Sequence, residues 1–248
     1  MKYLIFIIAI VLITLNTNAQ ELSGTIKYEI KHDWVKKINS VKYLSQSEKD
    51  KASYMWGTHS EYTEYAVLCF DKNTSRYEKI EDENKEGSWA WRSEEYIIYR
   101  NLEENTTYDL IREVNKLFVI KDEIQNPTWK ILNNIKEVAG HICMDAMYID
   151  PIKGNKIVAW FALDMPVPFG PDRFGGLPGM ILEIDISEGA LVMTATKIES
   201  KDVSEFLVKP KHKRKVKIHN EEYYTKLISD QVEQAKKAER PYFWQIRY

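Results

Sequence analysis

The chain has 248 residues, and its 35 Lys and Arg against 37 Asp and Glu give a formal net charge of −2 at pH 7. The chain therefore lacks the strong excess of basic residues that is typical of nucleic-acid-binding proteins, which argues against that class. Its 2 cysteines and 5 histidines form no Cys-x-x-Cys pair and no i, i+4 histidine pair. The sequence therefore predicts no metal site and no cofactor.

The first residues predict a secretory signal peptide. Lys2 precedes an apolar run over 4–15, and small residues follow up to Gln20. These are the n-region, h-region and cleavage site of an exported protein, and the run is shorter than the roughly 20 apolar residues of a membrane span. We expect a signal peptide over 1–19, cleaved after Ala19, with an uncleaved anchor as the alternative. Residues 20–248 are then a single β-rich domain, periplasmic or secreted, with no transmembrane segment.

Most of the remaining chain predicts short strands separated by turn residues. Residues 22–32 alternate apolar and polar side chains, which is the period of a strand with one buried face. No long helices alternate with the strands, so the pattern favours an antiparallel, mainly β (α+β) fold. Further strands are predicted over 64–70, 75–80, 89–100, 107–111, 117–121, 129–132, 138–149, 156–163, 180–186 and 191–198.

Two helices are predicted from their capping residues. Ser45 and Glu48 form a capping box before a helix over 46–56. Asn220 begins a helix over 221–239, with acidic residues in its first turn and an apolar stripe at helical spacing that should dock on the sheet. The aromatic residues that follow Pro241 are expected to pack down rather than form a loose tail.

Residues 164–179 predict one long ordered loop between two strands. Three prolines within 165–171 cannot donate to a sheet ladder, and the glycines of 175–179 suit a sharp turn with positive φ. Apolar residues on such a loop pack on the core or border a groove. The candidate binding residues are Phe169, Phe174, Leu177 and Met180.

Cys69 and Cys143 both lie in apolar, strand-like segments. A disulfide and two buried free thiols remain open, because pairing needs Cα atoms within about 7 Å, which the sequence does not show. His141 lies two residues before Cys143, so both side chains share one strand face. Two ligands without a third make a weak candidate for a metal or thiolate site. The favoured interpretation is that the two side chains are simply buried together on the strand.

The segment 209–217 holds six Lys or Arg in nine residues. It would suit anionic lipid head groups or lipopolysaccharide phosphates. Its alternating lysines would equally suit an edge strand that is protected by charge, or a solvated linker. The sequence favours the charged edge or linker.

The run Gly175 to Ile181 resembles the motif of the GLPGLI family, with Met180 in place of Leu, a change that conserves volume. The opening strand at 24–28 and the segment 140–146 also resemble that family of exported Bacteroidetes-type proteins. The resemblance implies a curved antiparallel sheet, half-barrel or bowl-like, with a C-terminal amphipathic helix packed on or across it. Members of that family resemble in outline periplasmic lipoprotein carriers and a bowl-like module of some glycan-processing enzymes. The resemblance implies no established activity and no catalytic residue.

Two classes of function follow. The first is a non-catalytic envelope protein that binds an apolar or peptide-like ligand or an outer-membrane partner. The second is a periplasmic hydrolase or metal-handling protein that uses His141. A pocket with His141 beside two acidic or sulfur groups would favour the second class, and a dry, uncharged concavity would favour the first.

Overall fold

The computed structural model describes residues 22–57, 59–80 and 95–247. The predicted signal peptide and residues 89–94 of one predicted strand lie outside these ranges. Within them, twelve strands form one sheet in the order β12-β6-β5-β4-β3-β2-β1-β11-β10-β9-β8-β7. All neighbours pair antiparallel except β12 and β6, which are parallel.

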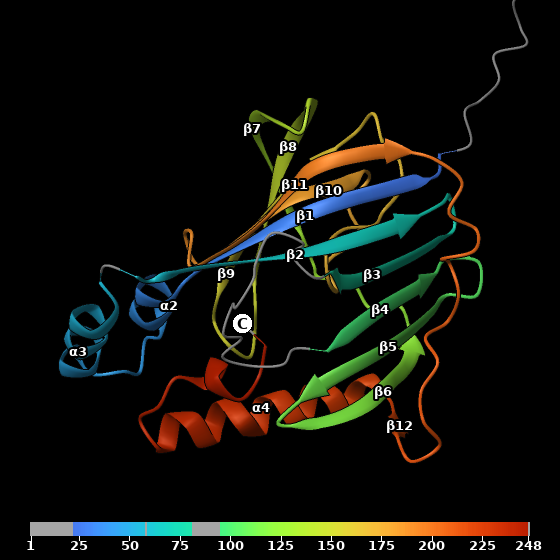
Figure 1. Ribbon diagram of the computed structural model, residues 1–248. Helices are drawn as coiled ribbons and strands as arrows, with labels where there is room; N and C mark the ends of the chain where they lie inside the picture. The colour runs from blue at the N-terminus through green and yellow to red at the C-terminus, as the bar shows by residue number, and fades with distance from the viewer. Residues whose placement is uncertain (1–21, 58, 81–94, 248) are drawn as a thin grey trace, which may run out of the picture.

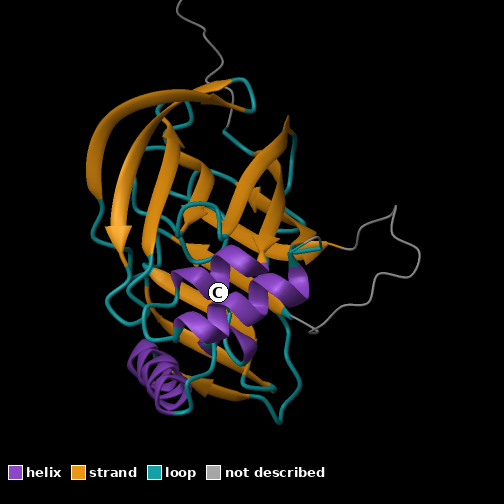
Figure 2. Ribbon diagram, turned by 90° about the vertical axis from the view of Figure 1, so that its left-hand side faces the viewer, coloured by secondary structure: helices purple, strands orange, loops and turns teal. Residues whose placement is uncertain are grey.

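The sheet is open and strongly curved, and the helices gather toward one end of it (Figure 1, Figure 2). The predicted curved, mainly β fold is confirmed. The strands are β1 (Gly24–Asp33), β2 (Glu61–Phe70), β3 (Thr74–Ile80), β4 (Tyr96–Asn101), β5 (Thr106–Glu113), β6 (Lys116–Glu123), β7 (Lys130–Val138), β8 (His141–Ile149), β9 (Lys156–Ala162), β10 (Met180–Ile186), β11 (Leu191–Ser200) and β12 (Lys217–His219). The helices are α2 (Trp34–Ser40), α3 (Gln46–Trp56), α4 (Glu221–Lys237) and the 3₁₀ turn η1 (Tyr242–Trp244).

The alternation of β1 positions the core. Ile26, Tyr28 and Ile30 are buried on one face, whereas Lys27 and Lys31 are exposed on the other. The Tyr28 hydroxyl reaches across the core and donates to the Ile181 carbonyl at 2.6 Å. This hydrogen bond removes the cost of burying a phenol and links β1 to β10.

Local signals placed most element boundaries. Ser45 caps α3 by accepting from the Glu48 backbone N–H, as predicted. The strand predicted over 138–149 is wrong at its start, because Ala139 and Gly140 form a turn with φ of 51° and 85° and divide it into β7 and β8. Helix α2 was missed, although Asp33 caps it by accepting from the Lys36 N–H.

Helix α4 lies across one end of the sheet, beside β6 (Figure 1). The Asn220 side chain caps it by accepting from the Tyr223 N–H at 3.0 Å. Its apolar stripe, with Ile228 buried, joins a second hydrophobic cluster that also contains α2, Ala52 of α3 and the C-terminal segment. Tyr242 and Phe243 are buried there, so the predicted packing of the C-terminal aromatic residues is confirmed in part. No helix in the described part of the chain is both long enough and apolar enough to cross a membrane.

The loop between β9 and β10 is packed closely, and its glycines serve two purposes. Gly176 has a φ of +84°, which is the positive φ expected of this run. At Gly179 the reason is proximity, because a Cβ would lie 2.1 Å from the carbonyl oxygen of Ala162. The turn therefore needs one glycine for its conformation and another for contact with the neighbouring strand.

We predict that Gly179→Ala lowers the free energy of unfolding by at least about 2 kcal/mol, because a backbone neighbour must shift. Gly154→Ala is the control: its φ is +72° but nothing lies within 4 Å of the added Cβ, so it costs about 1 kcal/mol. Urea unfolding of both variants measures the difference. Equal losses would show that the close contact is unimportant.

A buried polar cluster joins α2 to β1 and β2. The Lys37 ammonium lies 2.7 Å from His32 Nδ1 and donates to it, so His32 Nε2–H donates to Glu64 at 3.1 Å. Lys79 pairs with the second oxygen of Glu64. Burial alone raises the pKa of Glu64, but the hydrogen bond from His32 and the charge of Lys79 outweigh it and hold that pKa at about 2.

This lowered pKa predicts an acid-dependent loss of stability. Between the ordinary value of 4.5 and about 2, the unfolded chain binds a proton at Glu64 that the folded chain does not, so stability falls as pH falls. Glu64→Gln should therefore be less stable than the unmodified protein at pH 7, with the gap closing from about pH 4.5 toward pH 2. Urea unfolding at several pH values checks this, with the exposed Glu233→Gln on α4 as control. A gap that stays constant to pH 2 would contradict it.

Candidate functional site

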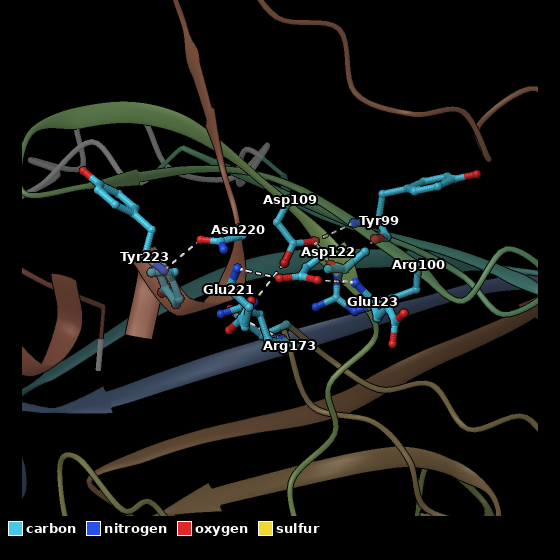
Figure 3. Close-up of polar contacts among 12 residues, drawn as sticks. Tyr99, Arg100, Asp109, Asp122, Glu123, Arg173, Asn220, Glu221 and Tyr223 are labelled. Carbon is cyan, nitrogen blue, oxygen red and sulfur yellow. Dashed lines mark hydrogen bonds and ion pairs between the residues drawn. The ribbon is translucent and has the colours of Figure 1, made fainter. Parts of the chain in front are cut away.

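The candidate site is built around the buried carboxylate of Asp109, which β5 carries to the inside of the sheet. Asp109 has no exposed surface. It accepts from the Thr107 hydroxyl at 2.9 Å, from Arg173 Nε at 3.0 Å and from the Tyr99 backbone N–H at 3.3 Å, and it pairs with Arg100. Figure 3 shows Arg100 and Arg173 converging on it from different segments. A charge buried this deeply is stable only with such partners.

Arg173 connects the loop between β9 and β10 to helix α4. Its Nη2 pairs with Glu221, the first residue of the helix, and its guanidinium lies 4.5 Å from the Tyr224 ring centre. Asp122 of β6 accepts from the Glu221 backbone N–H at 2.9 Å. That hydrogen bond and one from the Glu123 N–H lower the pKa of Asp122. The start of α4 is therefore attached to both the sheet and the loop (Figure 3).

Arg247 makes a second set of buried contacts. It pairs with Asp172, and its guanidinium lies 3.8 Å from the Tyr96 ring centre. Its backbone N–H donates to the fully buried Glu113 at 3.0 Å. Asp172 has a φ of 56°, a conformation that is uncommon for a residue other than glycine. The adjacent residues 172 and 173 thus point one carboxylate and one guanidinium into the same network.

Lys153 completes the polar wall by donating to the Arg247 carbonyl at 3.0 Å. Burial lowers the pKa of Lys153, and the negative charge of Asp150, which acts to raise that pKa, offsets only part of the effect. Tyr224 donates to Glu113 at 3.4 Å, and burial, with the charge of Glu113, raises the pKa of Tyr224. Every one of these groups thus has a polar partner within the protein.

A cavity of about 350 Å³ opens beside this network. Its walls mix aromatic and aliphatic side chains with amides and charges of both signs. The lining includes Gln125, Asn126, Tyr148, Asp150, Ile152, Lys153, Asn155, Ile157, Arg173, Phe174, Glu221, Tyr224, Thr225, Ile228 and Arg247. This volume falls in the usual range for a small-molecule site.

Of the four predicted binding residues, one lines this cavity and three do not. Leu177 and Met180 are buried in the main core, at 2% and 0% exposure. Phe169 is also buried and borders a smaller cavity of about 30 Å³. Phe174 lines the large cavity, and its ring centre lies 6.4 Å from that of Trp129. We therefore retain Phe174 as a candidate binding residue and assign the other three to the core.

Cys69 and Cys143 are both buried free thiols, so the structure has the second of the two alternatives that the sequence left open. They lie on β2 and β8, which β1, β11, β10 and β9 separate in the sheet. Burial raises the pKa of Cys143 to about 11. His141 pairs with Asp164 at 2.8 Å and does not line the large cavity. Among the described residues, no three His, Cys, Asp or Glu side chains gather as a metal site would require.

The important polar residues of the site were not singled out from the sequence. Arg173, Lys153 and Arg247 are isolated charges in the chain, and their partners lie far away: 64 residues separate Asp109 from Arg173. One signal was available. Asp172 and Arg173 interrupt a loop of Gly, Pro and apolar residues, where a pair of charges implies partners elsewhere.

Comparisons with known proteins support the fold and leave the activity open. The model of a family described as "Protein of unknown function (Porph_ging)" matches residues 151–183, which contain Lys153, Arg173 and Phe174. The chain matches no curated protein sequence. Structures of PNGF-II in the C2 and P21 space groups are similar, with TM-scores of 0.54 and 0.53 at 13% identity. Each match covers 83% of this chain and 32% of the other, so the chain spans about a third of PNGF-II.

We predict that Asp109→Asn lowers the free energy of unfolding by about 3–5 kcal/mol, because Arg100 loses its carboxylate partner and Arg173 keeps only Glu221. Asp230→Asn, in an exposed pair with Lys226, should cost below about 0.5 kcal/mol. Adding Arg100→Met to Asp109→Asn should recover part of the loss, since it removes the guanidinium whose ion-pair partner is Asp109. Urea unfolding compares the three. A loss at Asp109 no larger than that at Asp230 would contradict a structural role for the network.

Proposed function

We propose that this chain is an exported, GLPGLI-type cell-envelope protein that binds a peptide-like ligand in the large cavity without transforming it. Support for the family comes from the motif in the loop between β9 and β10, from the curved sheet and from the match at residues 151–183 to a family of unknown function. Support for export comes from the pattern of the first 19 residues. The observation that carries the binding proposal is the mixed lining of the cavity.

A peptide presents apolar side chains, amide groups and charged ends of both signs, and the cavity offers a counterpart to each. Tyr148 and Phe174 supply aromatic surface, and Asn155 supplies an amide. Asp150 and Lys153 supply opposite charges on the same wall. A purely apolar ligand would take water away from these charges without offering them a new hydrogen bond, which is unfavourable. The cavity therefore fits a peptide-like ligand better than an apolar one.

The charged groups are arranged for binding rather than for proton transfer. Arg173 and Arg247 keep their protons at any physiological pH, and each is already paired with a buried carboxylate. Across the network, the cations are Arg100, Lys153, Arg173 and Arg247, and the carboxylates are Asp109, Glu113, Asp150, Asp172 and Glu221. Four positive charges against five negative ones give a nearly neutral site, which favours a ligand with little net charge.

We predict that Thr225→Trp abolishes ligand binding by filling the cavity. Thr225 is an exposed residue of α4 on the cavity lining, and it makes no contact in the ion-pair network. The matched control is Lys226→Trp, which adds the same side chain one position along the helix and outside the lining. Native mass spectrometry with a pool of dipeptides and tripeptides is the measurement.

The unmodified protein and Lys226→Trp should retain the same peptides, and Thr225→Trp should bind them at least tenfold more weakly. Urea midpoints of the three proteins establish that all are folded. Failure of the unmodified protein to retain any peptide would overturn the peptide proposal. Equal binding by both tryptophan variants would place the ligand outside this cavity.

A further inference from the structure

A basic segment on the surface of the protein does not line the cavity and carries a separate inference. Residues 201–216 run from the end of β11 past the ends of the neighbouring strands to β12, and we call them the basic strap (Figure 1). Arg76 Nη1 donates to the Val208 carbonyl at 3.2 Å, and Lys209 pairs with Glu104 at 2.8 Å. Tyr108 hydrogen-bonds to His212 at 2.9 Å and stacks on its ring. The strap is therefore fixed against the sheet at three points.

The strap and β12 concentrate exposed positive charge. The exposed cations are Lys211, Lys213, Arg214, Lys215 and Lys217, and no acidic residue occurs anywhere in 206–220. In the described part of the chain, none of the five forms an ion pair, whereas their neighbour Lys209 does. The whole chain carries a net charge of −2, so this positive charge is segregated rather than average.

Exposed apolar side chains flank the same charges. Phe206 and Val208 precede the five cations and are 55% and 49% exposed, and Ile218 of β12 follows them and is 53% exposed. Bulky apolar side chains next to lysines and arginines are the usual composition of a segment that lies at a lipid interface. There the cations meet phosphate groups and the apolar side chains enter the acyl boundary.

Protection of a sheet edge explains only part of this arrangement. A charged edge needs its lysines on the edge strand itself, but four of the five cations precede β12, which runs over Lys217–His219. The strand also exposes Ile218, an apolar residue that an edge protected by charge would avoid. The predicted charged edge therefore accounts for Lys217, and the alternative of a solvated linker covers residues 211–215 but does not explain the exposed apolar side chains beside them.

We propose that the basic strap is a docking surface for a membrane that contains anionic phospholipid. Each Lys or Arg close to such a surface strengthens binding roughly fivefold, so the four cations of 211–215 together carry most of the affinity. Phe206 and Ile218 add apolar contact. The interaction is peripheral and weakens with added salt, because it depends on exposed charges.

The test uses the chain without residues 1–19 and measures co-sedimentation with lipid vesicles. One set is pure phosphatidylcholine, and in the other about a third of the lipid is phosphatidylglycerol. We predict binding to the second set alone, falling by at least tenfold as salt rises from roughly 0.05 M to 0.5 M. This comparison needs no variant, so it stands even if a substitution affects folding.

The strap variant carries Lys211→Gln, Lys213→Gln, Arg214→Gln and Lys215→Gln. Its matched control removes three exposed lysines and one exposed arginine from the α4 region: Lys226→Gln, Lys236→Gln, Lys237→Gln and Arg240→Gln. The strap variant should bind phosphatidylglycerol vesicles at least tenfold more weakly, and the control should stay within about threefold of the unmodified protein.

Absence of binding by the unmodified protein, or equal loss in both quadruple variants, would overturn the proposal. Binding that survives the four strap substitutions would also overturn it. Peptide retention by the strap variant should be unchanged, so this outcome is separate from that of the cavity experiment.

Discussion

The structure depends on the half-buried Arg173, which lies between two carboxylates on different elements. Asp109 belongs to the sheet and Glu221 to helix α4, while Arg173 itself is on the loop between β9 and β10. Burial alone lowers the pKa of Arg173, but these carboxylates and Tyr224 outweigh it and raise that pKa, so the side chain stays charged. Breaking one of these pairs costs far more than a surface ion pair would contribute. The loop, the sheet and the helix are thus held in one arrangement by groups that cannot be separated cheaply.

This constraint explains why the loop between β9 and β10 is ordered despite its glycines and prolines. The apolar side chains of Phe169 and Leu177 enter the core, and the Trp129 indole donates to the Gly175 carbonyl at 2.8 Å. Asp172 accepts an unfavourable φ because its carboxylate pairs with Arg247. The loop is therefore anchored on its apolar side by packing and on its polar side by charge, and the cavity lies where the polar side faces α4.

The elements that the sequence predicted well are those whose causes are local. Alternation along β1 and the caps at Ser45 and Asn220 act within a few residues, and the structure has them where expected. The division of β7 from β8 was missed because Ala139 gives no turn signal by itself, although Gly140 beside it does. The site was missed for a different reason. Its pairs join residues as far apart as Asp172 and Arg247, and a single charge carries no periodicity that would indicate its partner.

The proposed cavity and the proposed lipid-binding strap meet at the beginning of α4. β12 ends at His219, Asn220 then caps the helix, and Glu221 follows as part of the cavity wall. Asp122 of β6 holds this junction through the Glu221 backbone N–H, and β6 also pairs with β12. Because only β12 and Asn220 separate the strap from Glu221 and one strand supports both, the orientation of the strap is set by the same contacts that set the cavity wall. A protein that held a peptide-like ligand at a membrane would need such a shared support, since the ligand site must keep a fixed position relative to the lipid surface.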